Sequence, residues 1–191
     1  MALIKVRMTL EKGLGDVDRL RKHVNQGVKL GGRFSHQVFR HGKPITDEEW
    51  SDNIVPDQML NYSLDTALRN QSPRSNWYVG LFSGNVVPGA TLTGATVDAV
   101  LTEITAYTSA TRIPYLPAAA TGKILTNATS KAEFTINASV TAYGAFLVSH
   151  ATKGDTTSTT ICAAASKFTT QRTLVDQDQL LVTYQITASS T

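Results

Sequence analysis

Charged residues are scarce in this 191-residue chain. They make up 17% of it, against about a quarter in an average globular protein. That shortage excludes an intrinsically disordered chain, which combines high charge with low hydrophobicity, and it excludes a coiled coil rich in Glu and Lys. Hydrophobic residues make up 41% of the chain, which is enough to bury a core in one or two domains.

Cysteine and long apolar runs are also missing. Cys162 is the single cysteine, so the chain can form neither an internal disulfide nor a cysteine-based zinc site. No apolar run reaches the roughly eighteen residues of a membrane span. Lys5 and Arg7 interrupt the apolar residues at the start of the sequence, where a signal peptide would be continuously apolar. We therefore expect a protein that is made in a reducing cytoplasm and does not bind membranes.

Recognisable reaction chemistry is absent too. Gly13-Leu14-Gly15 begins a dinucleotide-binding pattern, but Asp18 stands where the third glycine would be. The four histidines lack metal-ligand spacing, and no serine lies in a nucleophile-elbow sequence. Asp176 and Asp178 could bind calcium but are typical of a solvated turn, and Cys162 is typical of a buried apolar position. The sequence thus predicts no catalytic, cofactor or metal site, and indicates a scaffold or binding protein rather than an enzyme.

Charge is distributed unevenly along the chain. Residues 1–43 hold ten lysines and arginines against three acids, a net charge of +7. Residues 44–75 have a net charge of −4, and residues 76–191 are neutral, with six charges of each sign. Either the first two segments neutralise each other within one fold, or the basic segment docks on an acidic partner surface. Nucleic acid is the weaker version of the second interpretation, because the segment has few aromatics and no recognition motif. The candidate partner-binding residues are Arg19, Arg21, Lys22, Lys29, Arg33 and Arg40.

The first 75 residues predict mixed helix and strand. Alternating apolar residues predict a strand over residues 2–9, and Asp16 can cap a short amphipathic helix after it. A further strand over residues 34–39 is followed by turn residues at 40–44. The spacing of Thr46-Asp47-Glu48-Glu49 is that of a capping box, which predicts a helical turn over residues 47–52.

The strongest helix prediction covers residues 57–70. Pro56 and Asp57 are typical of a helix start. One face of this helix is apolar, and the spacing predicts that this face is buried on a sheet. The face consists of Leu60, Leu64, Ala67 and Leu68.

Residues 76–191 predict β-structure almost throughout. They contain 23 threonines and 18 alanines, and the β-branched Thr side chain favours strands. Short strands recur between turn sequences, which indicates an antiparallel β-sandwich or small barrel over residues 76–191. We expect residues 1–75 to form a separate attachment segment before it. The predicted strands are Trp77–Phe82, Thr102–Thr108, Ala132–Asn137, Ala142–Ser149, Thr160–Phe168 and Gln179–Thr187.

Several of these segments resemble a group of small tailed-bacteriophage proteins. The resemblance covers roughly residues 53–187 and is carried by strand motifs rather than by catalytic residues. It implies a virion structural component, present in the virion after synthesis in the host cytoplasm. The matching segments are Trp77-Tyr78-Val79-Gly80-Leu81-Phe82, Glu103-Ile104-Thr105-Ala106-Tyr107, Thr111-Arg112, Tyr143-Gly144-Ala145-Phe146-Leu147-Val148-Ser149 and Lys153-Gly154.

Two classes of function fit these observations. The first is a phage structural protein, by preference a head decoration (cement) protein, with a neck, tail or fibre-anchoring protein as the nearest variant. It would bind the major capsid protein or other virion proteins as a homo-oligomer, without specific nucleic acid and without a cofactor. The second class is a carbohydrate-binding β module for host-surface glycans. Trp50, Trp77 and Tyr115 are its candidate aromatic residues, although the apolar surroundings of Trp77 favour a place in the core.

Overall fold

The computed structural model describes residues 28–190. The chain divides into two units, one of Gly31–Thr187 and one of residues 1–30 together with 188–191. Of the second unit the structure describes residues 28–30 and 188–190, which are the ends of two strands. The strand expected over residues 2–9 and the helix expected after Asp16 lie outside the described residues.

The first sheet, here called sheet A, is antiparallel and is built around two long strands, β1 and β10. These two strands are neighbours, β2 and β3 pair with β1, and β6 and β7 pair with β10. The β1–β2 hairpin turns through His41 and Gly42, both at positive φ, as a two-residue turn between right-twisted strands requires. The strands are β1 (Val28–Arg40), β2 (Lys43–Pro44), β3 (Glu49–Asp52), β6 (Ile124–Thr126), β7 (Ala132–Thr135) and β10 (Gln179–Ser190).

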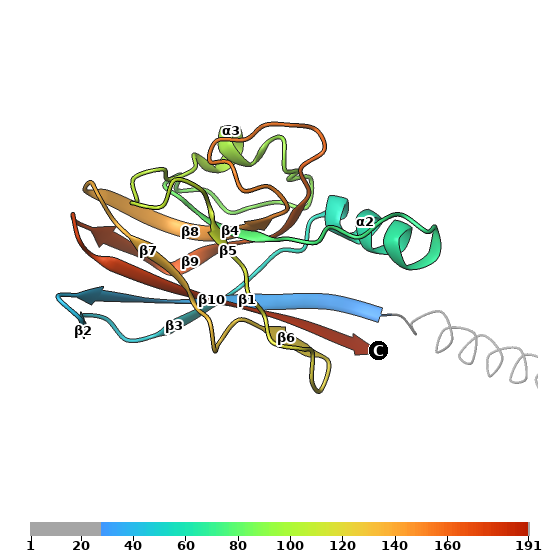
Figure 1. Ribbon diagram of the computed structural model, residues 1–191, viewed down its shortest axis with the longest axis horizontal. Helices are drawn as coiled ribbons and strands as arrows, with labels where there is room; N and C mark the ends of the chain where they lie inside the picture. The colour runs from blue at the N-terminus through green and yellow to red at the C-terminus, as the bar shows by residue number, and fades with distance from the viewer. Residues whose placement is uncertain (1–27, 191) are drawn as a thin grey trace, which may run out of the picture. The chain divides into compact units, whose positions relative to one another are not determined.

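The second sheet, sheet B, is also antiparallel and faces sheet A (Figure 1). Its strand order is β5-β4-β8-β9, so the protein is a β-sandwich, as the strand pattern predicted. Two helices accompany the sheets in the described part of the chain, α2 (Asp57–Leu68) and α3 (Val97–Leu101). The strands are β4 (Tyr78–Phe82), β5 (Ile113–Pro114), β8 (Val140–Val148) and β9 (Cys162–Leu174).

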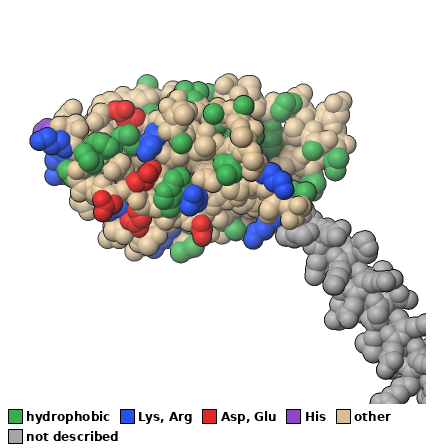
Figure 2. All heavy atoms as spheres, turned by 90° about the horizontal axis from the view of Figure 1, so that it is seen from below, with side chains coloured by type: hydrophobic (Ala, Val, Ile, Leu, Met, Phe, Trp, Pro, Cys, Tyr) green, Lys and Arg blue, Asp and Glu red, His purple; other side chains and the backbone are tan. Residues whose placement is uncertain are grey.

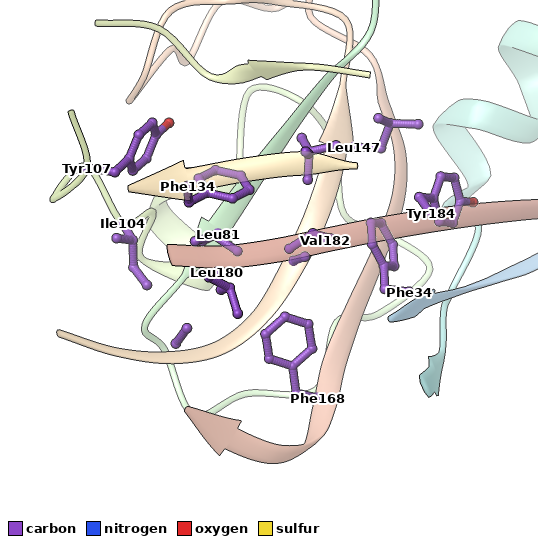
Figure 3. Close-up of a cluster of buried hydrophobic side chains, with 14 of the residues drawn as sticks. Phe34, Leu81, Ile104, Tyr107, Phe134, Leu147, Phe168, Leu180, Val182 and Tyr184 are labelled. Carbon is purple, nitrogen blue, oxygen red and sulfur yellow. The ribbon is translucent and has the colours of Figure 1, made fainter. Parts of the chain in front are cut away.

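The main core fills the space between the two sheets. The alternation seen in the sequence of β10 is realised there, because Leu180, Val182 and Tyr184 point inward and are at most 1% exposed. Phe34 of β1 stacks on Tyr184, with ring centroids 4.2 Å apart. Figure 3 shows how these side chains meet those of sheet B, including Leu81 and Leu147, in one cluster.

A second, smaller core lies on the other face of sheet B. α3 and the loops around it cover this face (Figure 1). The cluster includes Leu92, Val97, Leu101 and Val148, all nearly or fully buried. Cys162 belongs to it and is fully buried with a free thiol, as expected from its apolar neighbours. Burial raises the pKa of this thiol to about 12, so it is not a reactive thiolate at neutral pH.

Strands β4 and β8 are fitted together by two reciprocal pairs of phenylalanine and glycine. Gly80 lies opposite Phe146, and Phe82 lies opposite Gly144. A Cβ on Gly80 would overlap the Phe146 ring, and a Cβ on Gly144 would overlap both the Phe82 ring and the carbonyl oxygen of Ser166. Each ring therefore occupies the space that a side chain on the opposite strand would need.

Some departures from the sequence predictions have clear causes. Residues 47–52 were expected to form a helical turn, but Glu49–Asp52 is strand β3, paired with β1. The Ser51 hydroxyl accepts the backbone N–H of Thr169 in β9, so long-range contacts outweigh the local capping signal. Residues 102–108 were expected to form a strand but make only isolated bridges at Glu103 and Tyr107.

The predicted helix exists as α2, but a different face of it is buried. Leu60, Leu64 and Leu68 are 39%, 59% and 83% exposed, whereas Tyr62 is buried. The Tyr62 ring packs edge-on against Trp77, with centroids 5.9 Å apart. The leucine face is therefore left open on the described part of the chain.

The boundary expected near residue 76 falls inside the compact unit. β1 and β3 are strands of sheet A, and α2 contributes Met59 to the main core. The chain passes between the two units at Gly31 and again after Thr187, so the change in composition at residue 76 lies within one unit.

The glycines opposite the phenylalanine rings supply a direct test of this packing. We expect Gly144→Ala to lower the free energy of unfolding by about 1–3 kcal/mol, the usual cost of overpacking a core. Urea unfolding would measure the change. Gly89→Ala is the matched control, because a Cβ at Gly89 would meet nothing within 4 Å. Equal stability of the two variants would contradict the proposed fit.

Candidate functional site

A buried ion pair joins Glu103 to Arg112. The Arg112 Nε donates to Glu103 Oε1 at 2.8 Å, and Nη2 donates to Oε2 at 2.6 Å, so the two planar groups meet side by side. Both side chains are 0% exposed. Such bidentate contacts are the strongest form of charged hydrogen bond.

The remaining hydrogen-bonding groups of the pair tie two loops together, the one between α3 and β5 and the one between β8 and β9. Arg112 Nη1 donates to the carbonyl oxygen of His150 at 3.0 Å, and the Arg112 backbone N–H donates to that of Ala151 at 2.8 Å. The backbone N–H of Gly154 donates to Glu103 Oε2 at 2.7 Å. A buried pair is tolerated when its other donors and acceptors are satisfied in this way.

Lys153 closes the outer side of this loop junction. Its ammonium donates to the carbonyl oxygens of Thr105 and Tyr107 at 3.1 and 3.0 Å, and it lies 3.6 Å from the centroid of the Tyr107 ring. Partial burial lowers the pKa of Lys153, and burial raises the pKa of the Tyr107 hydroxyl. Glu103, Tyr107, Arg112, Lys153 and Gly154 all belong to the segments that carry the phage resemblance.

Breaking the pair should be costly, because it leaves one charge buried without a partner. We expect Arg112→Met to lower the free energy of unfolding by about 3–5 kcal/mol, and Glu103→Leu combined with Arg112→Met to recover part of that loss. Chemical denaturation would measure all three proteins.

The exposed Asp65–Arg69 pair of α2 is the matched control, since Arg69 is 79% exposed. Arg69→Met should cost less than about 1 kcal/mol. If Arg112→Met were no more damaging than Arg69→Met, the buried pair would not hold the loops as described.

The structure describes three of the six candidate basic residues, and all three lie on β1. Arg19, Arg21 and Lys22 lie outside the described residues. Lys29 and Arg33 are exposed on β1, and the Arg33 guanidinium lies 4.2 Å from the centroid of the Trp50 ring.

Arg40 is engaged within the fold rather than free for a partner. It makes two hydrogen bonds to Asp178, of 2.7 and 2.8 Å. Asp178 was expected in a solvated turn, but its side chain is 1% exposed and also accepts the backbone N–H of Val175. The hydrogen bonds from Arg40 are the main cause that lowers the pKa of Asp178. Asp178 is therefore a buried anchor for the hairpin at the end of β1.

Two acids of residues 44–75, Glu48 and Glu49, pair with basic residues late in the chain. Glu48 pairs with Lys131 at 3.0 Å, and Glu49 pairs with Arg172 at 2.7 Å. Within residues 28–190, none of the lysines and arginines up to residue 43 forms an ion pair with an acid of residues 44–75. Figure 2 accordingly shows acidic and basic side chains interspersed on one face rather than gathered by sign.

His36 is fully buried on β1. Its ring stacks on Phe168 with centroids 3.8 Å apart, and Nε2 lies 3.9 Å from a carboxylate oxygen of Glu49. Burial, and then the positive charge of Arg172, lower the pKa of His36 from 6.5 to about 4, although Glu49 opposes the shift.

His36 should therefore make the protein sensitive to acid. The unfolded chain takes up a proton at this residue near pH 6.5 and the folded chain only near pH 4, so stability is full above pH 6.5 and is lost as the pH falls toward 4. The loss attributable to His36 should be about 3 kcal/mol. Unfolding measured across this range should show a smaller acid loss in His36→Gln. An unaltered profile in His36→Gln would contradict the assignment.

An apolar pocket of about 540 Å³ is lined by residues of both sheets and of α2. Trp77 and Tyr115 line it together with Met59 of α2 and Leu125 and Ile186 of sheet A. Of the three aromatic residues suggested for glycan binding, the structure thus brings two into one site and leaves Trp50 elsewhere, beside Arg33.

A smaller polar pocket of about 270 Å³ adjoins the first. The two share Ser75, Asn76 and Tyr78, and the smaller pocket also has Arg74 and His150 in its lining. Sequence reasoning did not single out Arg74 or His150. One available signal was that Arg74 is one of two basic residues in an acidic stretch.

Comparison with known proteins does not assign the chain to a family. No protein-family model matches it, and a search of curated proteins finds no match. No helix of the described residues is long and apolar enough to span a membrane. Within residues 28–190, no group of three or more His, Cys, Asp or Glu side chains is placed to hold a metal ion.

Proposed function

We propose that this chain is a structural component of a tailed-phage virion, and specifically a head decoration protein that acts through protein–protein contacts. The sequence motifs that resemble phage proteins give the first support. A neck, tail or fibre-anchoring role is the nearest variant and is separated from decoration by copy number.

The observation that carries the proposal is the structural role of the segments that resemble phage proteins. Their charged residues form the buried Glu103–Arg112 junction, and their glycines and phenylalanines form the fit between β4 and β8. The buried ion pair and the Gly–Phe pairs stabilise the β-sandwich. A stable, rigid fold is expected of a particle component that must persist outside the cell.

The described surface also offers places for contact with a partner. The leucine face of α2 is exposed, and Lys29 and Arg33 are exposed on β1. In a particle with many copies, weak contacts add through effective concentration.

Purified particles provide the test of this proposal. We expect the protein to be incorporated in hundreds of copies distributed over the head, as measured by quantitative mass spectrometry and a low-resolution particle map. Six or twelve copies at one vertex would assign it to the neck or tail instead. Absence from the particle would overturn the virion assignment.

The same particles can test whether the basic segment makes the attachment. Arg19→Glu, Arg21→Glu and Lys22→Glu together should leave a folded protein that is no longer incorporated, and wild-type attachment should weaken with salt. Lys123→Glu, which reverses an exposed charge outside the basic segment, should be incorporated normally. Normal incorporation of the triple variant at low salt would contradict docking through these charges.

A second candidate function is binding of host-surface glycans. It is favoured by the placement of Trp77 and Tyr115 in the same pocket. Ligand sites combine apolar or aromatic walls with a few well-placed polar groups, and the adjoining Asn76 and Arg74 supply such groups.

A further inference from the structure

The two adjoining pockets share the lining residues Ser75, Asn76 and Tyr78 and together make a composite site with an apolar end and a basic end. The apolar end has the aromatic walls of Trp77 and Tyr115, and the Tyr115 hydroxyl is held by the carbonyl oxygen of Tyr184 at 3.2 Å. Tyr78 lines both ends. Because aromatic rings offer flat apolar faces, the apolar end suits a ring that has an apolar C–H face and polar groups around its rim.

The basic end carries one cation that no acid of the described chain neutralises. The Arg74 Nη2 donates to the carbonyl oxygen of Thr159 at 2.8 Å, and no carboxylate of residues 28–190 forms an ion pair with the guanidinium. His150 stands beside it in the pocket lining, with Nδ1 3.7 Å from Asp155. The remaining N–H groups of Arg74 are therefore able to bind an anionic group in the forked geometry that guanidinium favours.

The buried ion pair makes this end of the site rigid. Arg112 bonds to the carbonyl oxygens of both His150 and Ala151, and both residues line the polar pocket. On the other side, Trp77 is fixed by the edge-on contact with Tyr62 and by a hydrogen bond from the Tyr115 backbone to its carbonyl oxygen. A site whose walls are fixed before binding avoids much of the ordering cost of association.

The edge of the sheet beside the pocket is unsuited to an added peptide strand. Its short edge strand β5 ends in Pro114, and Pro117 follows three residues later. Proline lacks the N–H that strand addition needs, and it is a usual means of blocking sheet edges. A ligand of this pocket is therefore bound by side chains rather than by strand pairing. This is consistent with a ring that packs on aromatic side chains and is held at its rim by polar groups.

We propose that this composite site binds an acidic saccharide, with the sugar ring against Trp77 and Tyr115 and its carboxylate on Arg74. The proposal rests on the second candidate function, glycan binding, and names the class of glycan. Uronic-acid units of a bacterial surface polysaccharide have this chemistry.

The test compares acidic tetrasaccharides with the same sugars after their charge is removed. Tetragalacturonate and a glucuronate-containing hyaluronan tetrasaccharide are titrated by calorimetry at low salt, alongside their methyl esters. The full-length protein should bind at least one acid roughly tenfold more tightly than its ester, the usual scale for one charged hydrogen-bonded contact. Arg74→Gln should abolish that preference, whereas Arg69→Gln, which removes an exposed positive charge just after α2 and outside both pocket linings, should retain it.

A second readout places the ligand in the pocket. Trp50 and Trp77 are the two tryptophans of the chain, so in Trp50→Phe the fluorescence reports Trp77. It should change when the acidic saccharide binds. An unchanged signal during binding would place the ligand elsewhere and overturn the proposal.

The remaining outcomes separate this proposal from the functions it builds on. Equal binding of acid and ester, unaffected by Arg74→Gln, would refute the acidic class and leave glycan binding standing. Binding of no saccharide would refute both. Tight binding of decanoate in place of any sugar would identify the site as one for a fatty acid and overturn the proposal. None of these results alters the particle experiment.

Discussion

The Glu103–Arg112 ion pair is the interaction that orders the loop between α3 and β5 and the loop between β8 and β9. Two opposite charges without solvent are costly unless each hydrogen-bonding atom is satisfied. Here the demand is met by the backbone of residues 150–154. The loops are consequently ordered by a charge requirement rather than by regular secondary structure. The same contacts set the position of one wall of the composite pocket.

The strands were predictable because their pattern is local. Alternating apolar residues in β10 and the apolar runs of β4 and β8 require no knowledge of the rest of the chain. The antiparallel sandwich followed from the number of such strands and the turns between them. The same reasoning failed over residues 47–52, where partners more than eighty residues away, including Arg172 and Lys131, favour a strand over the local helical signal.

The face of α2 and the candidate site depended on contacts that no local pattern contains. The spacing of Leu60, Leu64 and Leu68 indicates an apolar face, but it cannot tell whether this protein or another molecule covers that face. Glu103 and Arg112 are nine residues apart with no regular element between them, so their meeting could not be read from periodicity. The pocket joins residues of α2, β4 and β10, which come together only after both sheets have formed.

Sheet B has a separate cluster of buried side chains on each face, and Cys162 lies in the outer cluster, beneath α3. The outer cluster and the α3 segment that covers it can open while the core between the sheets stays closed, since stability need not be uniform across a fold. A single thiol in that position is a natural reporter of such partial opening. The rate at which a thiol reagent modifies Cys162 would then depend on the free energy of this local opening, whereas chemical denaturation would measure the free energy of unfolding the whole sandwich. The chain thus contains within its own sequence the means to distinguish local from global stability.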